Sequence, residues 1–135
     1  MSFESEVRSI ETWFSTRYSE TGVQYANVRF DPAELSEWAR LTISPGGANI
    51  ASMGSDPNLY RHTGVVSVQI FVTPNSGATR ALQVADTIAD IFRSAKIDNI
   101  QMHAPDVERV GVVDGWYQIN VECNYYRDSY LARAS

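Results

Sequence analysis

The sequence has few of the residues that cross-link a protein or carry out chemistry. Cys123 is its only cysteine, so an internal disulfide framework is excluded, and a lone thiol is most simply a small buried side chain. The two histidines, His62 and His103, have no second ligand at metal-binding spacing. No GxSxG turn and no glycine-rich phosphate loop occurs. We therefore expect no catalytic, cofactor-binding or metal-binding residues, and no enzymatic activity.

The sequence also lacks long apolar runs and an excess of positive charge. No run approaches the ~20 apolar residues of a membrane helix, and the first residues are polar and acidic, unlike a signal peptide. The 16 acidic residues outnumber the 11 basic ones, and the net charge of −5 disfavours binding to nucleic acid through phosphate neutralisation. We expect one domain over residues 1–135, made in the cytoplasm and without a membrane partner.

Two segments have the periodicity of amphipathic helices. The first is predicted over residues 2–19, with Ser2 as its cap and an apolar stripe at intervals of three and four residues. The second is predicted over residues 76–95, and its apolar arc is wider than packing against one sheet requires. Either the first helix covers the extra arc, which we favour, or a second subunit does. The stripe of the first helix consists of Phe3, Val7, Ile10 and Phe14.

Alternating apolar residues predict strands between and after these helices. The segment 44–62 reads as a polar loop, in which Pro45-Gly46-Gly47 would turn the chain and 48–52 could return as a hairpin partner. Asp114-Gly115 is a strong hairpin signal, because both central residues of such a turn need a positive φ. From about residue 127 the chain is expected to fray. The predicted strands cover residues 27–30, 37–44, 63–72, 100–102, 107–113 and 116–126.

These elements predict an α+β fold: a four- to five-stranded mixed or antiparallel sheet with two helices packed on one face. The strand at 63–72 has a β-branched face, which marks the centre of the sheet. On the last strand, alternate residues from Tyr117 to Tyr125 face the core, and the residues between them face water or a polar partner. The residues expected in the core are Ile70, Ile88, Phe92 and Ile119.

The order of these segments resembles the tail terminator, or tail-completion, family of long-tailed bacteriophages over most of the chain. The amphipathic first helix, the 27–30 segment, the strand at 38–44 with its Pro45 turn and the alanine-rich helix at 78–95 carry the resemblance. Two short motifs add to it: Leu59-Tyr60-Arg61-His62-Thr63-Gly64 before the valine-rich strand, and Asp114-Gly115-Trp116-Tyr117 at the start of the last strand.

The resemblance implies a structural virion protein that forms a homo-hexameric ring, caps the tail tube of a siphovirus and ends its polymerisation. The implied partners are further copies of the chain, the tail tube protein, and a neck, head-completion or connector protein, with DNA passing through the lumen without specific binding. The implied location is the head-proximal end of the virion tail, after assembly in the host cytoplasm. No catalytic residues come with this family.

No family motif marks the ring contacts, so the pattern of this chain alone points to interface residues. We expect them at Tyr60, Arg61 and His62, and on the outward face of the last strand. The alternative is that both surfaces are simply solvated. Two other functions stay open: another head–tail joining or tail tube subunit, and a small α+β ligand-binding or enzymatic domain, which would need a polar pocket. The residues expected on the last strand are Trp116, Gln118, Asn120 and Glu122.

Overall fold

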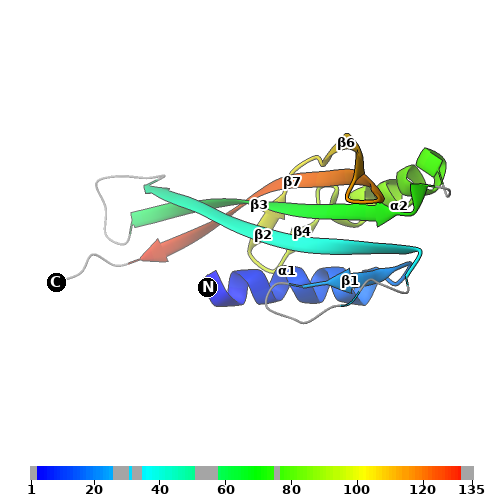
Figure 1. Cartoon of the computed structure of the whole chain (residues 1–135). Coiled ribbons are helices and arrows are strands. Elements are labelled where there is room, and N and C mark those ends of the chain that lie inside the picture. The colour runs from blue at the N-terminus through cyan, green and yellow to red at the C-terminus, as the bar shows by residue number, and fades with distance from the viewer. Residues whose placement is uncertain (1–2, 26–30, 32–34, 51–57, 75–76, 132–135) are drawn as a thin grey trace.

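The structure is a computed structural model, which describes residues 3–25, 31, 35–50, 58–74 and 77–131. Figure 1 shows its helices and strands, coloured along the chain. No helix in the described residues is long and apolar enough to cross a membrane. In chain order the elements are α1 (Phe3–Arg17), β1 (Gly22–Gln24), β2 (Glu37–Ile50), β3 (Asn58–Val72), α2 (Gly77–Phe92), β4 (Lys96–Ile97), β5 (Ile100–Met102), β6 (Asp106–Val113) and β7 (Trp116–Leu131).

One mixed sheet organises the fold. Its strands follow the order β1-β2-β3-β7-β5-β4, and β6 also pairs with β7. β1 is parallel to β2, and the other described pairs are antiparallel. The α+β class is as predicted, but the described residues form seven strands rather than four or five. β1 and β4 have three and two residues, which is too short for a periodic pattern to reveal. The predicted strand at 27–30 lies outside the described residues.

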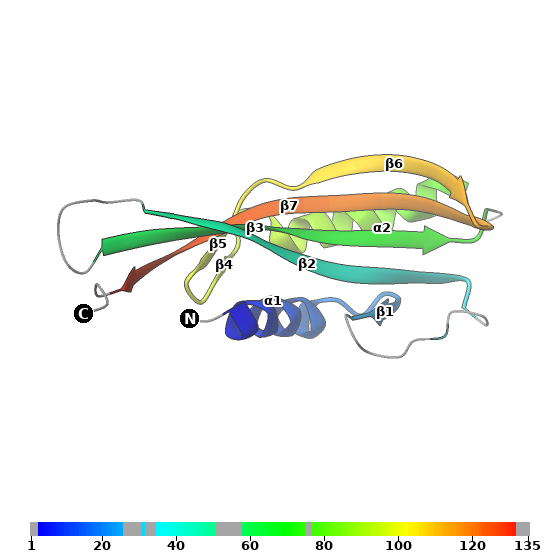
Figure 2. The same cartoon turned by 60° about the vertical axis from the view of Figure 1, so that its left-hand side comes forward.

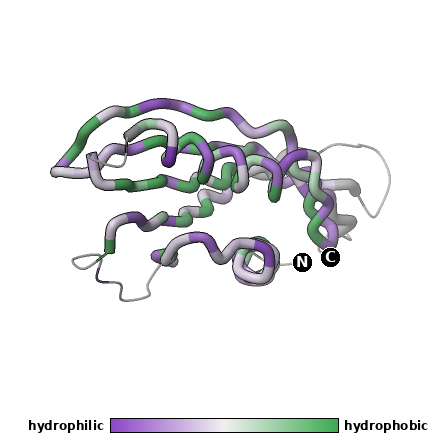
Figure 3. Tube along the Cα trace, turned by 90° about the vertical axis from the view of Figure 1, so that its right-hand side faces the viewer, coloured by the Kyte–Doolittle hydropathy of each residue, from purple (hydrophilic) through white to green (hydrophobic). Residues whose placement is uncertain are grey.

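Both helices cover the same face of the sheet. Alternate residues of β2, β3 and β7 form one core with α1 and α2, and Figure 3 shows the sheet curving over α1. Phe14 of α1 stacks on Phe92 of α2, with ring centroids 5.5 Å apart. The predicted core is confirmed, since each of its residues is 1% exposed or less: Ile70, Ile88, Phe92 and Ile119.

The wide apolar arc of α2 is covered within this chain. Leu82 and Ile91, at its edges, pack against the core. The indole nitrogen of Trp13 on α1 donates a hydrogen bond to the backbone oxygen of Ile91 at 3.2 Å. Arg80 ties the start of α2 to β2 through Glu37, with nitrogen and oxygen 2.6 Å apart. The favoured interpretation of the arc is therefore confirmed, and α2 gives no argument for a second subunit.

The buried side of α1 differs from the predicted stripe. Glu6, Ile10 and Phe14 are buried, whereas Phe3 is 53% exposed. The difference arises because Glu6 meets buried polar partners on β7. A rule based on apolar periodicity assigns a glutamate to water, so the sequence pattern missed Glu6. Ile10 and Phe14 of the predicted stripe are buried as expected.

The sequence Pro45-Gly46-Gly47 does not turn the chain, and the described parts of the predicted loop, residues 44–50 and 58–62, are strands. β2 continues through the three residues, and its register with β3 shifts there, so the two glycines form a bulge opposite Thr63. A Cβ atom on Gly46 would lie 2.9 Å from the backbone oxygen of Thr63, which explains the glycine. The predicted return strand at 48–52 is wrong, because β2 keeps its direction to residue 50.

Three strands continue past the helices as an arm, which Figures 1 and 2 show extending beyond the start of α1. We define the arm as residues 45–50 of β2, 58–63 of β3 and 127–131 of β7. The last strand was predicted to end at residue 126, but β7 continues to residue 131 and pairs with β3 along its whole length. The polar sequence on either side of 51–57 therefore belongs to paired strands.

Candidate functional site

The structure divides the predicted interface residues into two groups at opposite ends of the β3–β7 ladder. Arg61 pairs with Asp128, and Phe71 pairs with Gln118. From residue 118 to residue 128, β7 advances about 33 Å at 3.3 Å per residue. One small contact cannot contain both groups, so we describe them separately as the arm group and the strand group.

In the arm group, Arg61 points to the face of the sheet that has no helices, which we call the open face. Its guanidinium donates two hydrogen bonds to the carboxylate of Asp128, at 2.8 and 2.9 Å. These bonds hold the pKa of Asp128 below its usual value. His62 lies on the helix-facing side, where Phe3 meets its ring edge-on. Tyr60 shares that side, because alternate residues of a strand face the same way.

A buried carboxylate next to His62 joins α1 to the base of the arm. Glu6 accepts a hydrogen bond from the Tyr125 hydroxyl and another from Arg127 Nε, each at 2.5 Å. These three residues, the Glu6 clamp, are each 2% exposed or less. Burial and the carboxylate raise the pKa of Tyr125, while burial and the charge of Arg127 lower the pKa of His62. A Cβ atom on Gly64 would overlap the Tyr125 ring and hydroxyl, so glycine leaves the space that the clamp needs.

The environment of Cys123 does not favour a reactive thiol. Cys123 is buried, and its thiol donates to the backbone oxygen of His103 at 3.1 Å. Burial raises the pKa of Cys123 to about 11, so the thiolate needed for nucleophilic attack is scarce at neutral pH. Among the residues that the structure describes, no group of three or more His, Cys, Asp or Glu side chains could hold a metal ion.

Trp116 and Gln118 of the strand group lie beside an aromatic cluster on the open face. Trp38 and Phe71 stack with ring centroids 4.2 Å apart, and Trp116 meets Trp38 edge-on at 6.0 Å. The exposed fractions of Trp38, Phe71 and Gln118 are only 5%, 7% and 8%. Arg40 lies over the stack, 5.3 Å from the Trp38 ring centroid. The expected polar, wet face is therefore closed at this end, and a partner would meet an aromatic cluster here.

Glu122 is exposed, and it belongs to a patch of carboxylates. In the β6–β7 register Asp106 lies opposite Glu122, and Glu108 lies opposite Asn120, all on the open face. We call Asp106, Glu108 and Glu122 the acidic patch. All three are exposed, and none forms an ion pair within the described residues. Asn120 is half-buried and accepts a hydrogen bond from Gln118 at 2.9 Å.

The acidic patch adjoins an uncovered apolar edge. β6 pairs with β7 along one edge, and no described strand pairs with the other. Its register shifts between Arg109 and Gly111, where Gly111 has a φ of 98°. Native proteins usually protect such edges, because a free apolar strand pairs readily with another chain. The exposed valines of β6, at 40–63% exposure, are Val107, Val110, Val112 and Val113.

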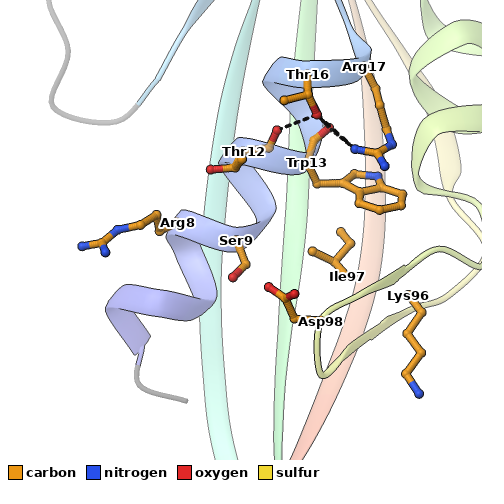
Figure 4. Close-up of a pocket in the computed structure, with 9 residues that line it drawn as sticks. All are labelled: Arg8, Ser9, Thr12, Trp13, Thr16, Arg17, Lys96, Ile97 and Asp98. Atoms are coloured by element: carbon orange, nitrogen blue, oxygen red, sulfur yellow. Dashed lines mark hydrogen bonds between the residues drawn. The ribbon is translucent and has the colours of Figure 1, made fainter.

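A groove between α1 and the β4–β5 hairpin gathers basic residues (Figure 4). We call it the basic groove; its volume is about 550 Å³. Arg17 lies over the ring of Trp13, 3.3 Å from the centroid, and Arg8 pairs with Glu4 in an exposed position. Lys96 lies on the hairpin at the rim, and in Figure 4 the charged ends of Lys96 and Arg8 point outward, away from the centre of the groove. Asp98 adds an acidic side chain to the described lining. The hydroxyls of Ser9, Thr12 and Thr16 complete its polar lining.

Sequence reasoning missed both the acidic patch and the basic groove. Residue 96 is far along the chain from residues 8 and 17, so their charges looked scattered within a net charge of −5. Strand alternation did place Glu122 on the outward face. What the sequence could not give was the register that sets Asp106 opposite it.

Comparison with known proteins identifies the family. The profile of a family described as "Phage tail terminator protein" matches residues 7–125. The chain belongs to the phage tail terminator family. One solved structure superposes on it with a TM-score of 0.63 at 17% identity, covering 93% of this chain and 97% of that chain, which shows that the two share a fold. No curated protein sequence matches the chain. The family makes it a structural protein of bacteriophage tail assembly, and its class is not one of enzymes.

Proposed function

We propose that the chain forms a closed homo-hexameric ring on the head-proximal end of the tail tube. The ring ends polymerisation of the tube protein and presents its other side to a neck, head-completion or connector protein. Membership of the tail terminator family over residues 7–125 is the observation that carries this proposal. The mature location is the virion tail, and the chain takes no cofactor.

The shape of the chain supports an assembly role. The arm extends past the helices and offers paired strands for contact with a tube end or a neighbouring copy. The free edge of β6 and the two charged surfaces lie outside the core. A ring with different faces toward tube and neck needs such edges and patches more than it needs an enclosed pocket.

The charge of the chain supports passage of DNA without specific binding. Six copies would carry a charge of about −30, from −5 for each chain, and a lumen of that sign repels phosphates. Tight binding would need basic side chains gathered on the lumen wall. The DNA would then slide through the ring.

The direct test is tail assembly with and without the chain. Tubes grown from purified tube protein should stop at a defined length when the chain is added, and electron micrographs should place it at one end. Phage particles that lack the chain should have tails of irregular length that do not join heads. A virion reconstruction with the chain at every level of the tube would instead make it a tube subunit. Mutant particles with normal tails joined to heads would reject the proposal.

A further inference from the structure

Two surfaces of opposite charge lie on different sides of the chain. Asp106 faces Glu122 directly across two strands, and like charges in that position destabilise a sheet. The chain keeps this arrangement although no described basic residue pairs with the acidic patch. A cationic surface of another molecule would remove the cost.

The basic groove has the complementary character. Arg17 and Lys96 are exposed and form no ion pair within the described part of the chain. The pair of Arg8 with Glu4 is 70% and 76% exposed, and an exposed pair of this kind is weak enough to exchange partners. Half-buried Trp13 gives the groove its apolar surface beside Arg17, whereas Ile97 at the base is only 3% exposed.

One molecule cannot bring the two surfaces together. In Figures 1 and 2 β6 forms the edge of the sheet away from α1, so the acidic patch can reach a basic groove only on another copy. A contact between two different surfaces of identical chains continues from copy to copy, and it closes into a ring when the rotation allows. Two copies of β6 paired with each other would stop at a dimer, and their acidic patches would repel.

We propose that the β6 edge of one chain, with Asp106, Glu108 and Glu122, docks into the basic groove of the next chain. The edge of β6 enters the groove so that Val107 and Val112, on one face of the strand, contact Trp13. The carboxylates, on the other face, pair with Lys96 and Arg17. This inference rests on the proposed ring and names the two surfaces that build it. It also explains why a soluble chain keeps an apolar edge with four exposed valines.

The test exchanges charge between the two surfaces. Glu108→Lys alone and Lys96→Glu alone each place like charges across the contact, and should weaken self-association of the full chain about tenfold or more. The double variant Glu108→Lys/Lys96→Glu restores opposite charges and should regain most of the association. Sedimentation velocity at rising concentration measures the association, and electron microscopy of tube ends measures ring formation.

Matched controls come from one exposed residue of α2 and one in the turn that follows it. Asp86→Lys and Arg93→Glu change the net charge by the same amounts as the test variants but lie outside both surfaces. Both should associate and cap tubes like the wild type. Circular dichroism and thermal unfolding check that each variant keeps its fold.

The docking is wrong if the single variants associate as strongly as the wild type. It is also wrong if the double variant associates no more strongly than the weaker of the two single variants. A wild-type chain that stays monomeric both in solution and on tube ends would overturn it as well. If Lys96→Glu abolishes salt-dependent binding of duplex DNA without changing self-association, the groove binds phosphates and the docking is wrong. The proposed function fails on different evidence. If wild-type rings form by the charge exchange and yet tube length is uncontrolled, the docking stands and the capping role does not.

Discussion

Two ion pairs lie back to back at the base of the arm, one on each face of β7. Arg127 pairs with Glu6 on the helix-facing side, where the side chains are 2% and 1% exposed. Asp128, the next residue, pairs with Arg61 on the open face, where the side chains are 28% and 46% exposed. The chemistry is the same, a guanidinium with a carboxylate. The two pairs differ in burial, and burial decides what it costs to break them. The buried pair would leave an uncompensated charge, whereas water can replace a lost partner in the exposed pair.

The largest expected effect comes from breaking the buried pair. Glu6→Gln removes the charge that balances Arg127 and leaves an uncompensated buried cation, so we expect a loss of about 3–5 kcal/mol in the free energy of unfolding. Urea unfolding followed by circular dichroism measures it. Glu4→Gln, on the exposed side of the same helix, is the control and should change stability by less than about 0.5 kcal/mol. A loss at Glu6 no larger than that at Glu4 would contradict this view of the clamp.

The second-largest effect is expected at Gly64, which leaves room for the Tyr125 side chain of the clamp. Gly64→Ala places a methyl group where the Tyr125 ring lies, so the tyrosine must move away from Glu6. We expect a loss of about 1–3 kcal/mol by overpacking. Gly47→Ala is the matched control, because a Cβ atom on Gly47 has nothing within 4 Å. If thermal unfolding shows equal losses for the two alanines, the clamp does not depend on Gly64.

A smaller effect is expected from the exposed pair. Asp128→Asn removes the carboxylate that Arg61 binds, yet water replaces it, and the loss should be about 0.2–1 kcal/mol. Salt screens exposed pairs, so the difference from wild type should shrink in about 1 M salt. Chemical unfolding at low and high salt measures both quantities. A loss comparable to that of Glu6→Gln would remove the distinction between the two faces.

The smallest effect is a pH dependence at His62. Its pKa is lowered in the folded chain by burial and by Arg127, so the unfolded chain takes up the proton first as the pH falls. Stability should therefore decline as the pH drops below about 6.5, the unfolded value. Glu37 and Asp128 have lowered pKa values and titrate below this window. His62→Asn should flatten the profile of unfolding free energy between about pH 7.5 and 5.5, and an unchanged slope in this variant would contradict the assignment to His62.

Two glycine signals show how far local sequence determines the chain path. Asp114-Gly115 forms the predicted hairpin turn, with φ values of 51° and 83°, because that turn requires a backbone few residues adopt. Pro45-Gly46-Gly47 suggested a turn equally well but forms a bulge in a continuous strand. Pairing with Thr63 and the rest of β3 decides the outcome there, and a partner so distant in sequence leaves no local signal.

The same reason limits what the sequence says about the site. The core positions Ile70, Ile88 and Ile119 could be predicted from periodicity. An apolar side chain favours burial whatever its neighbours are, so its own identity is the signal. The partner of Glu6 lies on β7, more than a hundred residues away, and only the fold brings the two together. The basic groove likewise joins α1 to the β4–β5 hairpin. The preferences of single residues predicted the core. The clamp and the charged surfaces depend instead on pairs of residues that are distant in sequence and meet only in the folded chain.

The uninterrupted pairing of β3 has a mechanical consequence. Its fifteen residues extend about 50 Å at 3.3 Å per residue, with β2 on one edge and β7 on the other. A load applied at the tip of the arm is therefore carried in shear along both ladders, so many backbone hydrogen bonds share it at once. The arm behaves as a stiff lever rooted in the core, and it transmits torque to the body instead of absorbing it by bending.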